Sequence, residues 1–269
     1  MDTLSVCITT YNEAGNIAAC LRSVSWADEI IVVDGQSTDA TREIARKYTR
    51  KVFVRPNHAN LNLNKNYGFS KARGEWVLCL DADESVPAQL KTAIMKILTT
   101  GTRMDGFLLP RKNYYFGRWL RWGGNYPDPQ LRLFRRVKGR FPARHVHERL
   151  AVDGKVGRFK AAFEHFPYKD IQQYFHKFNF YTSFEGNFLY QKGQRITAWN
   201  APWNLYGKHL FRLLRKYFLK GGFLDGWQGL LAHVFSMFTG VVSAGKLWEK
   251  QKQNKSRVHS PGSKVTTSS

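Results

Sequence analysis

The chain has 269 residues, a formal net charge of +22 at pH 7, and 43% hydrophobic residues. This length allows one large core, or one core and a smaller helical subdomain, and the apolar content excludes an intrinsically disordered chain. The charge indicates a polyanionic partner and leaves nucleic acid, an anionic membrane surface and phosphorylated substrates open.

Short apolar strands alternate with helices in the first part of the chain. Strands are predicted at 4–10, 29–34, 52–54 and 77–81, and helices at about 15–24, 39–48 and 61–71. Continuous apolar strands in this order are typical of a parallel, doubly wound α/β sheet that is covered on both faces. Cys7, Cys20 and Cys79 lack the spacing of a metal site, so we expect reduced thiols in the core of a cytosolic protein.

Polar side chains end three of these strands. Thr9 closes the first, Asp34 the second, and Asp81 and Asp83 the fourth. The carboxyl ends of parallel strands meet at one edge, where ligands bind in open α/β sheets. Because alternate residues point the same way, Asp81 and Asp83 can serve one hard cation and its phosphates, although such a pair also occurs in solvated turns. No glycine-rich phosphate loop follows the first strand, which disfavours the dinucleotide fold and the P-loop.

The pattern changes after Met104. Strands are predicted at 106–110 and 130–134, separated by a Trp-, Tyr- and Gly-rich loop at 114–126, and a further strand ends at His165. From Tyr168 the apolar spacing predicts three helices, the first through about Tyr190, the second from Pro202 to Gly221–Gly222 and the last ending near Lys250.

The second of these helices is basic and carries aromatic residues. Such a helix either lies on an anionic bilayer or packs on the protein with a solvated basic face. The apolar run Leu230–Val242 contains His233 and Ser236, and we expect it to be too short to span a bilayer.

Four motifs together resemble those of one enzyme family. They are Ile8–Glu13 (ITTYNE), Val32–Asp39 (VVDGQSTD), Asn64–Gly68 (NKNYG) and Gly74–Glu84 (GEWVLCLDADE). In this order they resemble the family 2 inverting glycosyltransferases. The resemblance implies the GT-A fold, a doubly wound, mostly parallel α/β sheet, here with a C-terminal helical extension. The implied domains are a catalytic domain at 1–167, with a nucleotide-binding half at 1–100 and an acceptor half at 101–167, a helical subdomain at 168–250 and a disordered tail at 251–269.

The resemblance also implies a UDP-sugar donor and a Mg²⁺ or Mn²⁺ ion. Thr9, Tyr11 and Glu13 would line the uridine pocket, and Asp34 would accept from the uracil ring. The remaining implied contacts are Lys65 near the base or the phosphates, Asp81 near the ribose or the metal, and Asp83 on the metal.

Three further positions belong to the same implied site. Arg132 and Arg135 bind donor or acceptor phosphate through bidentate contacts, unless they are a solvated strand edge. His165 reaches the diphosphate or completes the metal shell, since imidazole is a common ligand of such metals.

The catalytic base is implied by the pair His147–Glu148, where the family more often has Glu-Asp. Glu148 takes the matching position, and Asp128 is the alternative. Inversion requires one carboxylate to accept the proton of the attacking hydroxyl group while the metal stabilises the leaving diphosphate. His145 and His147 are open as metal ligands, although packing roles are commoner for lone histidines.

A closer resemblance, to the lipopolysaccharide-core glucosyltransferase branch of this family, is carried by Arg132–Phe134, His147–Glu148, the strand at His165 and Gly222–Gly226. That likeness implies glucose as the donor sugar, an inner-core heptose on lipid A as acceptor, and a peripheral location on the cytoplasmic face of the inner membrane, reached through the basic C-terminal helix. A polyprenyl-linked, capsule or protein acceptor is the alternative.

A basic nucleic-acid-binding protein is an alternative of another class, but no reading helix or stacking motif supports it, and we expect no nucleic acid partner.

Overall fold

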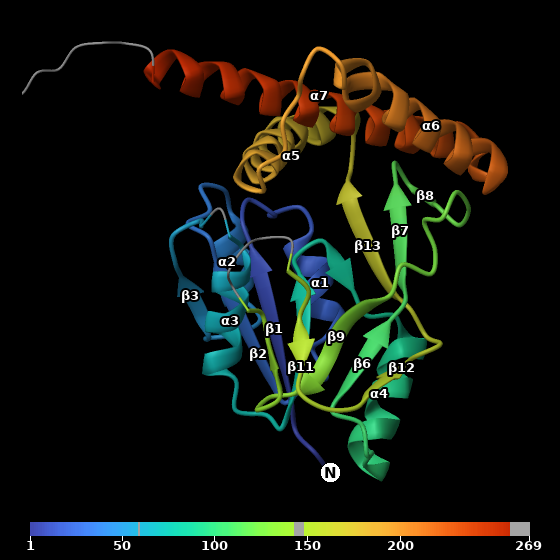
Figure 1. Cartoon of the computed structure of the whole chain (residues 1–269). Coiled ribbons are helices and arrows are strands. Elements are labelled where there is room, and N and C mark those ends of the chain that lie inside the picture. The colour runs from blue at the N-terminus through green and yellow to red at the C-terminus, as the bar shows by residue number, and fades with distance from the viewer. Residues whose placement is uncertain (59, 143–147, 259–269) are drawn as a thin grey trace, which may run out of the picture. The chain divides into compact units, whose positions relative to one another are not determined.

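The structure is a computed structural model that describes residues 1–58, 60–142 and 148–258. It contains two compact units, Met1–Pro167 and Tyr168–Ser269 (Figure 1). His145 and His147, and residues 259–269 of the predicted tail, lie outside the described residues.

A seven-stranded sheet forms the centre of the first unit. Its order is β12-β6-β9-β4-β1-β2-β3, and within the described residues only β9 runs antiparallel to its neighbours. The strands are β1 (Leu4–Thr10), β2 (Glu29–Asp34), β3 (Val52–Val54), β4 (Trp76–Asp81), β6 (Gly106–Leu109), β9 (Gln130–Arg135) and β12 (Val156–Arg158). The four helices are α1 (Ile17–Ser23), α2 (Thr41–Arg46), α3 (Asn62–Lys71) and α4 (Ala88–Thr100).

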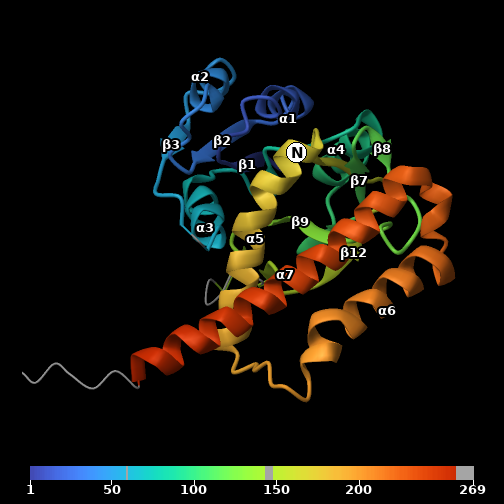
Figure 2. The same cartoon turned by 90° about the horizontal axis from the view of Figure 1, so that it is seen from above.

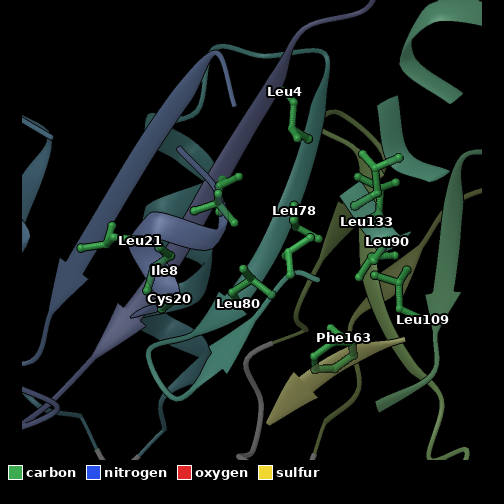
Figure 3. Packing of buried hydrophobic residues seen from close by; sticks show 14 of the residues in the cluster. Leu4, Ile8, Cys20, Leu21, Leu78, Leu80, Leu90, Leu109, Leu133 and Phe163 are labelled. Atoms are coloured by element: carbon green, nitrogen blue, oxygen red, sulfur yellow. The ribbon is translucent and has the colours of Figure 1, made fainter. Parts of the chain in front are cut away.

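Apolar side chains cover both faces of this sheet. On one face, Ile8 and Leu80 pack with Leu90 of α4 in a cluster that Figure 3 shows from close by. On the other face, Cys7 and Cys79 pack in a second cluster, which includes Phe69 of α3 and Phe134 of β9. Successive strand residues therefore point into different clusters, as period-two alternation requires. The three cysteines are free and buried, as predicted.

A smaller sheet joins one short strand of the nucleotide-binding half to three strands of the acceptor half. Its order is β5-β13-β7-β8, built from β5 (Glu84–Ser85), β13 (Phe163–Tyr168), β7 (Arg111–Tyr115) and β8 (Arg118–Trp119), and β10 (Gly139–Arg140) pairs separately with β11 (Ala151–Val152). The region predicted as a loop at 114–126 therefore begins with a hairpin, which turns at Phe116 and Gly117 with positive φ angles of 50° and 82°. His165 lies inside β13 rather than at its end.

Helices make up the second unit. They are α5 (Ile171–Gln191), α6 (Lys208–Leu214) between π-helical turns at Trp203–Gly207 and Arg215–Leu219, a 3₁₀ turn at Gly222–Asp225, and α7 (Gly226–Val258). The rings of Tyr174 on α5 and Phe235 on α7 stack with centroids 4.2 Å apart. The ammonium group of Lys246 on α7 donates to Asn179 and Ser183 of α5.

The last helix differs from its prediction in two ways. It continues past Lys250 to Val258, because the Glu, Lys and Gln residues after Trp248 are good helix formers. The apolar stretch is also longer than the run 230–242, since Gly222–Asn254 is long and apolar enough to span a bilayer by length and composition alone. Neutral Gly, Ser and Ala residues, together with Leu247 and Trp248, extend the apolar run beyond 230–242. This criterion is also met by core helices of soluble proteins, so it establishes no membrane span.

Candidate active site

The carboxyl ends of β1 and β4 lie next to each other. The two strands are parallel neighbours, and Thr9 pairs with Asp81 in their register. The hydroxyl group of Thr9 donates to Oδ1 of Asp81 over 3.0 Å. The predicted meeting of polar strand ends at this edge is thus seen directly, and Thr9 holds the aspartate rather than only filling the strand.

Two cations from different elements bind Asp81. Lys65 of α3 places its Nζ 2.8 Å from Oδ1, and Arg132 of β9 places Nη2 2.9 Å from Oδ2. Burial alone would raise the pKa of Asp81, but these two cations hold it well below its usual range. Asp81 is therefore a permanent anion with hydrogen bonds to both of its oxygens.

Glu84 shares Arg132 with Asp81. The Glu84 side chain is fully buried, accepts from Nη2 of Arg132, and accepts from the backbone N–H of Asp81 over 2.9 Å. Burial, together with the nearby Asp81 charge, raises the pKa of Glu84 despite the guanidinium. Burial alone would lower the pKa of Arg132, but the two carboxylates raise it well above its usual value, so this buried side chain stays charged.

Asp83 and His165 face each other across β5 and β13. His165 pairs with Glu84 in the register of these strands, and its Nε2 lies 3.7 Å from Oδ2 of Asp83. Its other ring nitrogen, Nδ1, lies 2.7 Å from Oδ1 of Asn113 on β7. A metal-binding histidine characteristically donates its second N–H to such an oxygen.

Asp83 and His165 are the pair that best fits a divalent cation. Among residues 1–58, 60–142 and 148–258, no three His, Cys, Asp or Glu side chains are grouped so as to hold a metal by themselves. Both oxygens of Asp81 already accept hydrogen bonds from Thr9, Lys65 or Arg132. Mg²⁺ usually takes only one or two protein carboxylates and completes its shell with water and substrate phosphates, so a two-residue site fits this chemistry.

The loops after β1 and β2 are bound together. Asp34 is fully buried and accepts from both the backbone N–H and the hydroxyl group of Ser37. The Ser37 hydroxyl oxygen in turn accepts from the N–H of Asn12, which has a left-handed φ of 52°. Asp34 therefore orders the loop that forms this side of the site, whatever it contacts in a ligand.

Tyr11 and Glu13 occupy the same loop with opposite exposures. Tyr11 is 45% exposed, whereas Glu13 is 9% exposed and accepts from the side chain of Asn16 over 2.6 Å. The N–H of Glu13 donates to Thr41 of α2, which ties the loop to that helix. Of the two, Tyr11 offers the accessible surface for a planar base.

The prediction for Arg135 is corrected by its position in β9. Because β9 runs antiparallel to β4, Arg135 pairs with Trp76, at the end of β4 opposite to Asp81. Its guanidinium lies over the Trp76 ring at 4.7 Å and approaches Asp2 at 3.7 Å. Arg132, three residues earlier, lies at the candidate site, but the antiparallel direction carries Arg135 away from it.

Residues 5–164 match the model of the family described as glycosyl transferase family 2. The chain belongs to this family. It is 26% identical to an uncharacterized glycosyltransferase of Rickettsia felis over 273 residues, which cover 95% of this chain and 93% of that protein. It is 23% identical over 253 residues to the lipopolysaccharide core biosynthesis glycosyltransferase LpsC of Rhizobium meliloti, covering 92% of each.

Solved structures show more distant likenesses. The TarS fragment 1–349 of S. aureus with UDP-GlcNAc has a TM-score of 0.48 and 16% identity, covering 94% of this chain and 92% of that one. Glucosyl-3-phosphoglycerate synthase of Mycobacterium tuberculosis, with Mn²⁺ and UDP-glucose, has a TM-score of 0.34 and 25% identity over 43% of this chain and 44% of that one. These likenesses are too remote to assign roles. The family and the observed parallel-rich sheet confirm the predicted α/β fold of the GT-A class. The family also confirms that this protein is a glycosyltransferase.

The two candidate bases of the glycosyltransferase have different surroundings. Asp128 receives two hydrogen-bond contacts from Arg111, at 2.8 and 2.7 Å, and one from Asn113 at 3.1 Å. Burial alone would raise the pKa of Asp128, but Arg111 and its other donors lower it, which makes a poor base. Glu148 is half-buried and lies two residues before Leu150, whose side chain is buried in the core.

Three residues of the candidate site, Glu84, Arg111 and Asn113, were not predicted from the sequence. Glu84 appears there only within a motif, although a glutamate that follows two aspartates at a strand end already indicates a site residue. Arg111 and Asn113 lie on β7, which no periodicity marked, and their contacts to Asp128 and His165 cross between distant segments. No pattern in the sequence indicates those contacts.

Proposed function

We propose that this glycosyltransferase transfers a hexose from a UDP-sugar to a membrane glycolipid, with inversion at the anomeric carbon. The hexose that we propose is glucose. The observation that carries the proposal is the junction of Lys65, Arg132 and Asp81 beside the pair Asp83–His165, at the carboxyl ends of β1 and β4. Cations and a metal-competent pair at one sheet edge suit a nucleoside diphosphate.

The donor is held by residues of the first unit. The uridine side of the donor site is lined by Thr9, Tyr11 and Glu13, with Asp34 behind them. The side chains nearest the diphosphate are those of Lys65 and Arg132. Asp83 and His165 would hold Mg²⁺ or Mn²⁺. When bound, that ion would neutralise charge that grows on the departing UDP.

Glu148 is proposed as the general base. It accepts the proton of the acceptor hydroxyl group as the oxygen attacks the sugar carbon from the face opposite UDP. Glu148 is favoured over Asp128, because the Arg111 contacts of Asp128 disfavour its protonation. No covalent intermediate is required, since a single displacement inverts the configuration.

The acceptor is proposed as a heptose of the lipopolysaccharide inner core. The similarity to LpsC supports a core sugar acceptor, and the net charge of +22 suits an acceptor that carries phosphates and carboxylates. The protein would then work as a peripheral protein on the cytoplasmic face of the inner membrane, without a nucleic acid partner.

A transfer assay tests the proposal. The protein is incubated with UDP-glucose, Mn²⁺ and lipopolysaccharide truncated at the inner core, and the product is examined by NMR for the anomeric configuration. Glu148→Gln should bind UDP like the wild type and fail to transfer, whereas Asp128→Asn, whose amide oxygen can still accept from Asn113, should keep measurable transfer. A product with retained configuration, or full activity of Glu148→Gln, would contradict the mechanism, and transfer only to polyprenyl-linked or capsule acceptors would contradict the acceptor.

A further inference from the structure

The helical segment from Trp203 to Leu219 exposes apolar side chains. Trp203, Tyr206, Leu210, Leu214 and Phe218 follow one another at steps of three or four residues, and each is between 45% and 65% exposed. This spacing places them on one side of the helix. On a helix that merely covers a core, that side would be polar.

One polar side chain of the same segment, His209, points the other way. His209 is only 4% exposed, and its Nε2 lies 3.1 Å from the carbonyl oxygen of Asn204. It packs so closely on α7 that a Cβ added at Gly240 would lie 2.1 Å from its Nδ1. Figures 1 and 2 both show α6 beside α7. The outward direction of the apolar stripe is therefore built into the packing of α6 on α7.

The turn between α6 and α7 continues this apolar surface. Leu219, Phe223, Leu224 and Trp227 are between 49% and 81% exposed. We call these four residues, together with the five apolar residues named above in the segment 203–219, the hairpin face. Monomeric soluble proteins rarely expose so many large apolar side chains in one short segment, and such surfaces mark interaction sites.

Positive charge surrounds the hairpin face. The sequence from Gly186 to Leu224 contains seven Lys or Arg residues and no Asp or Glu. Arg212, Arg215 and Lys220 are exposed between the apolar residues of the face. Long basic side chains can keep their charge at the level of lipid headgroups while the apolar residues enter the bilayer.

We infer that the α6–α7 hairpin is a membrane-interface element whose hairpin face inserts into the acyl region of an anionic lipid leaflet, with Arg212, Arg215 and Lys220 at the headgroups. This deepens the proposed function by naming the surface through which the enzyme reaches a lipid-linked acceptor. A second copy of the chain is a less suitable occupant, because it would bring two sets of seven Lys and Arg residues together.

The packing of α7 favours a surface-bound hairpin over a membrane-crossing helix. One side of α7 binds α5 through the Tyr174–Phe235 stack and the Lys246 hydrogen bonds, and His209 of α6 packs on Gly240. If α7 crossed the membrane alone, Lys246 would lose its hydrogen-bond partners on α5. A polar group without partners is costly in the hydrocarbon region.

Vesicle flotation of the full chain tests the inference. The protein should float with vesicles that combine phosphatidylcholine and phosphatidylglycerol, and far less with phosphatidylcholine alone. Replacing Leu210, Leu214 and Phe218 by Ser should abolish flotation. Replacing Arg212, Arg215 and Lys220 by Gln should weaken binding about a hundredfold, at roughly one kcal/mol per charge.

A matched control removes the same charge from the first unit. Arg46, Lys47 and Arg50 are exposed there, and changing all three to Gln should leave flotation unchanged. All variants alter exposed side chains, and circular dichroism checks that each is folded. Flotation that persists in the folded serine variant, or that falls equally in the control, would overturn the inference. So would a wild-type protein that forms dimers and binds no vesicles, if the serine substitutions make it monomeric.

UDP binding of the same proteins separates this inference from the proposed function. Vesicle binding without any UDP binding would leave the hairpin assignment standing and remove the glycosyl transfer proposal. UDP binding and transfer to a soluble core oligosaccharide without vesicle binding would do the reverse.

Discussion

Nδ1 of His165 lies 2.7 Å from Oδ1 of Asn113. The amide group of Asn113 is oriented by Asp128, because an ionised carboxylate only accepts and so must face the amide nitrogen, at 3.1 Å. Oδ1 of Asn113 can then only accept, which places the proton of neutral His165 on Nδ1. The lone pair on Nε2 consequently faces Asp83, as a metal ligand requires.

Replacing Asn113 by Leu should free the imidazole of His165 to adopt the other tautomer. Loss of such a supporting residue typically weakens metal binding by about 10- to 100-fold. Titration of Mn²⁺ in the presence of UDP, followed by electron paramagnetic resonance, measures this, and ¹⁵N NMR of the metal-free protein reports the tautomer. Gln130→Leu removes a different contact to Asp128 and serves as control. An unchanged tautomer and unchanged Mn²⁺ affinity in Asn113→Leu would refute this chain of contacts.

Replacing Arg132 by Met should strongly destabilise the first unit. The change leaves Glu84, whose side chain is fully buried, and Asp81 without their shared cation. Removing one partner of a buried ion pair costs about 3–5 kcal/mol. Urea unfolding measures the loss, and the double variant Arg132→Met, Glu84→Gln should recover part of it. A double variant no more stable than the single one would show that Glu84 is not the group that Arg132 neutralises.

Asp34 has a loop role and a proposed ligand role that two variants separate. Ser37→Ala removes the hydroxyl contact and leaves the carboxylate, so we expect a loss of about 1 kcal/mol in stability with UDP still bound. Asp34→Asn should abolish UDP binding if the carboxylate accepts from the uracil. Calorimetry that finds equal UDP affinity in Asp34→Asn and the wild type would leave Asp34 with the loop role alone.

Acid should loosen the α6–α7 hairpin. Burial, with help from Lys208 and Arg212, lowers the pKa of His209 below its unfolded value of about 6.5. The unfolded state therefore binds the proton first, and stability falls as the pH drops below that value, by at most about 1.4 kcal/mol per pH unit. Protection of residues 203–240 from hydrogen exchange, corrected for the intrinsic rate at each pH, should be lower at about pH 5.5 than at pH 7. His209→Gln should reduce this dependence, whereas His176→Gln, at an exposed position of α5, should not.

Apolar patterns within a segment, and the meeting of parallel strand ends that follows from them, were predicted, whereas the other contacts between segments were not. The apolar runs of β1, β2 and β4 and their polar ends follow from the chain itself, so the meeting of Thr9 and Asp81 was predictable from parallel pairing. Arg135 was misplaced because the direction of β9 depends on which strand it pairs with, and no local pattern records that.

The helical unit shows the same limit. Its periodicity predicts helices, but periodicity cannot say which face of α6 packs inward. The placement of His209 on Gly240 decides this and exposes Leu210 and Leu214. The contact joins residues on two helices, so it becomes visible only in the structure.

The most direct test of the account is calorimetric titration with UDP, with and without Mn²⁺, of the wild type and Asp83→Asn. The account predicts metal-dependent UDP binding by the wild type and loss of the metal dependence in Asp83→Asn, because Asp83 and His165 are the pair proposed to hold the ion. Absence of UDP binding under both conditions, or the same metal dependence in both proteins, would contradict it.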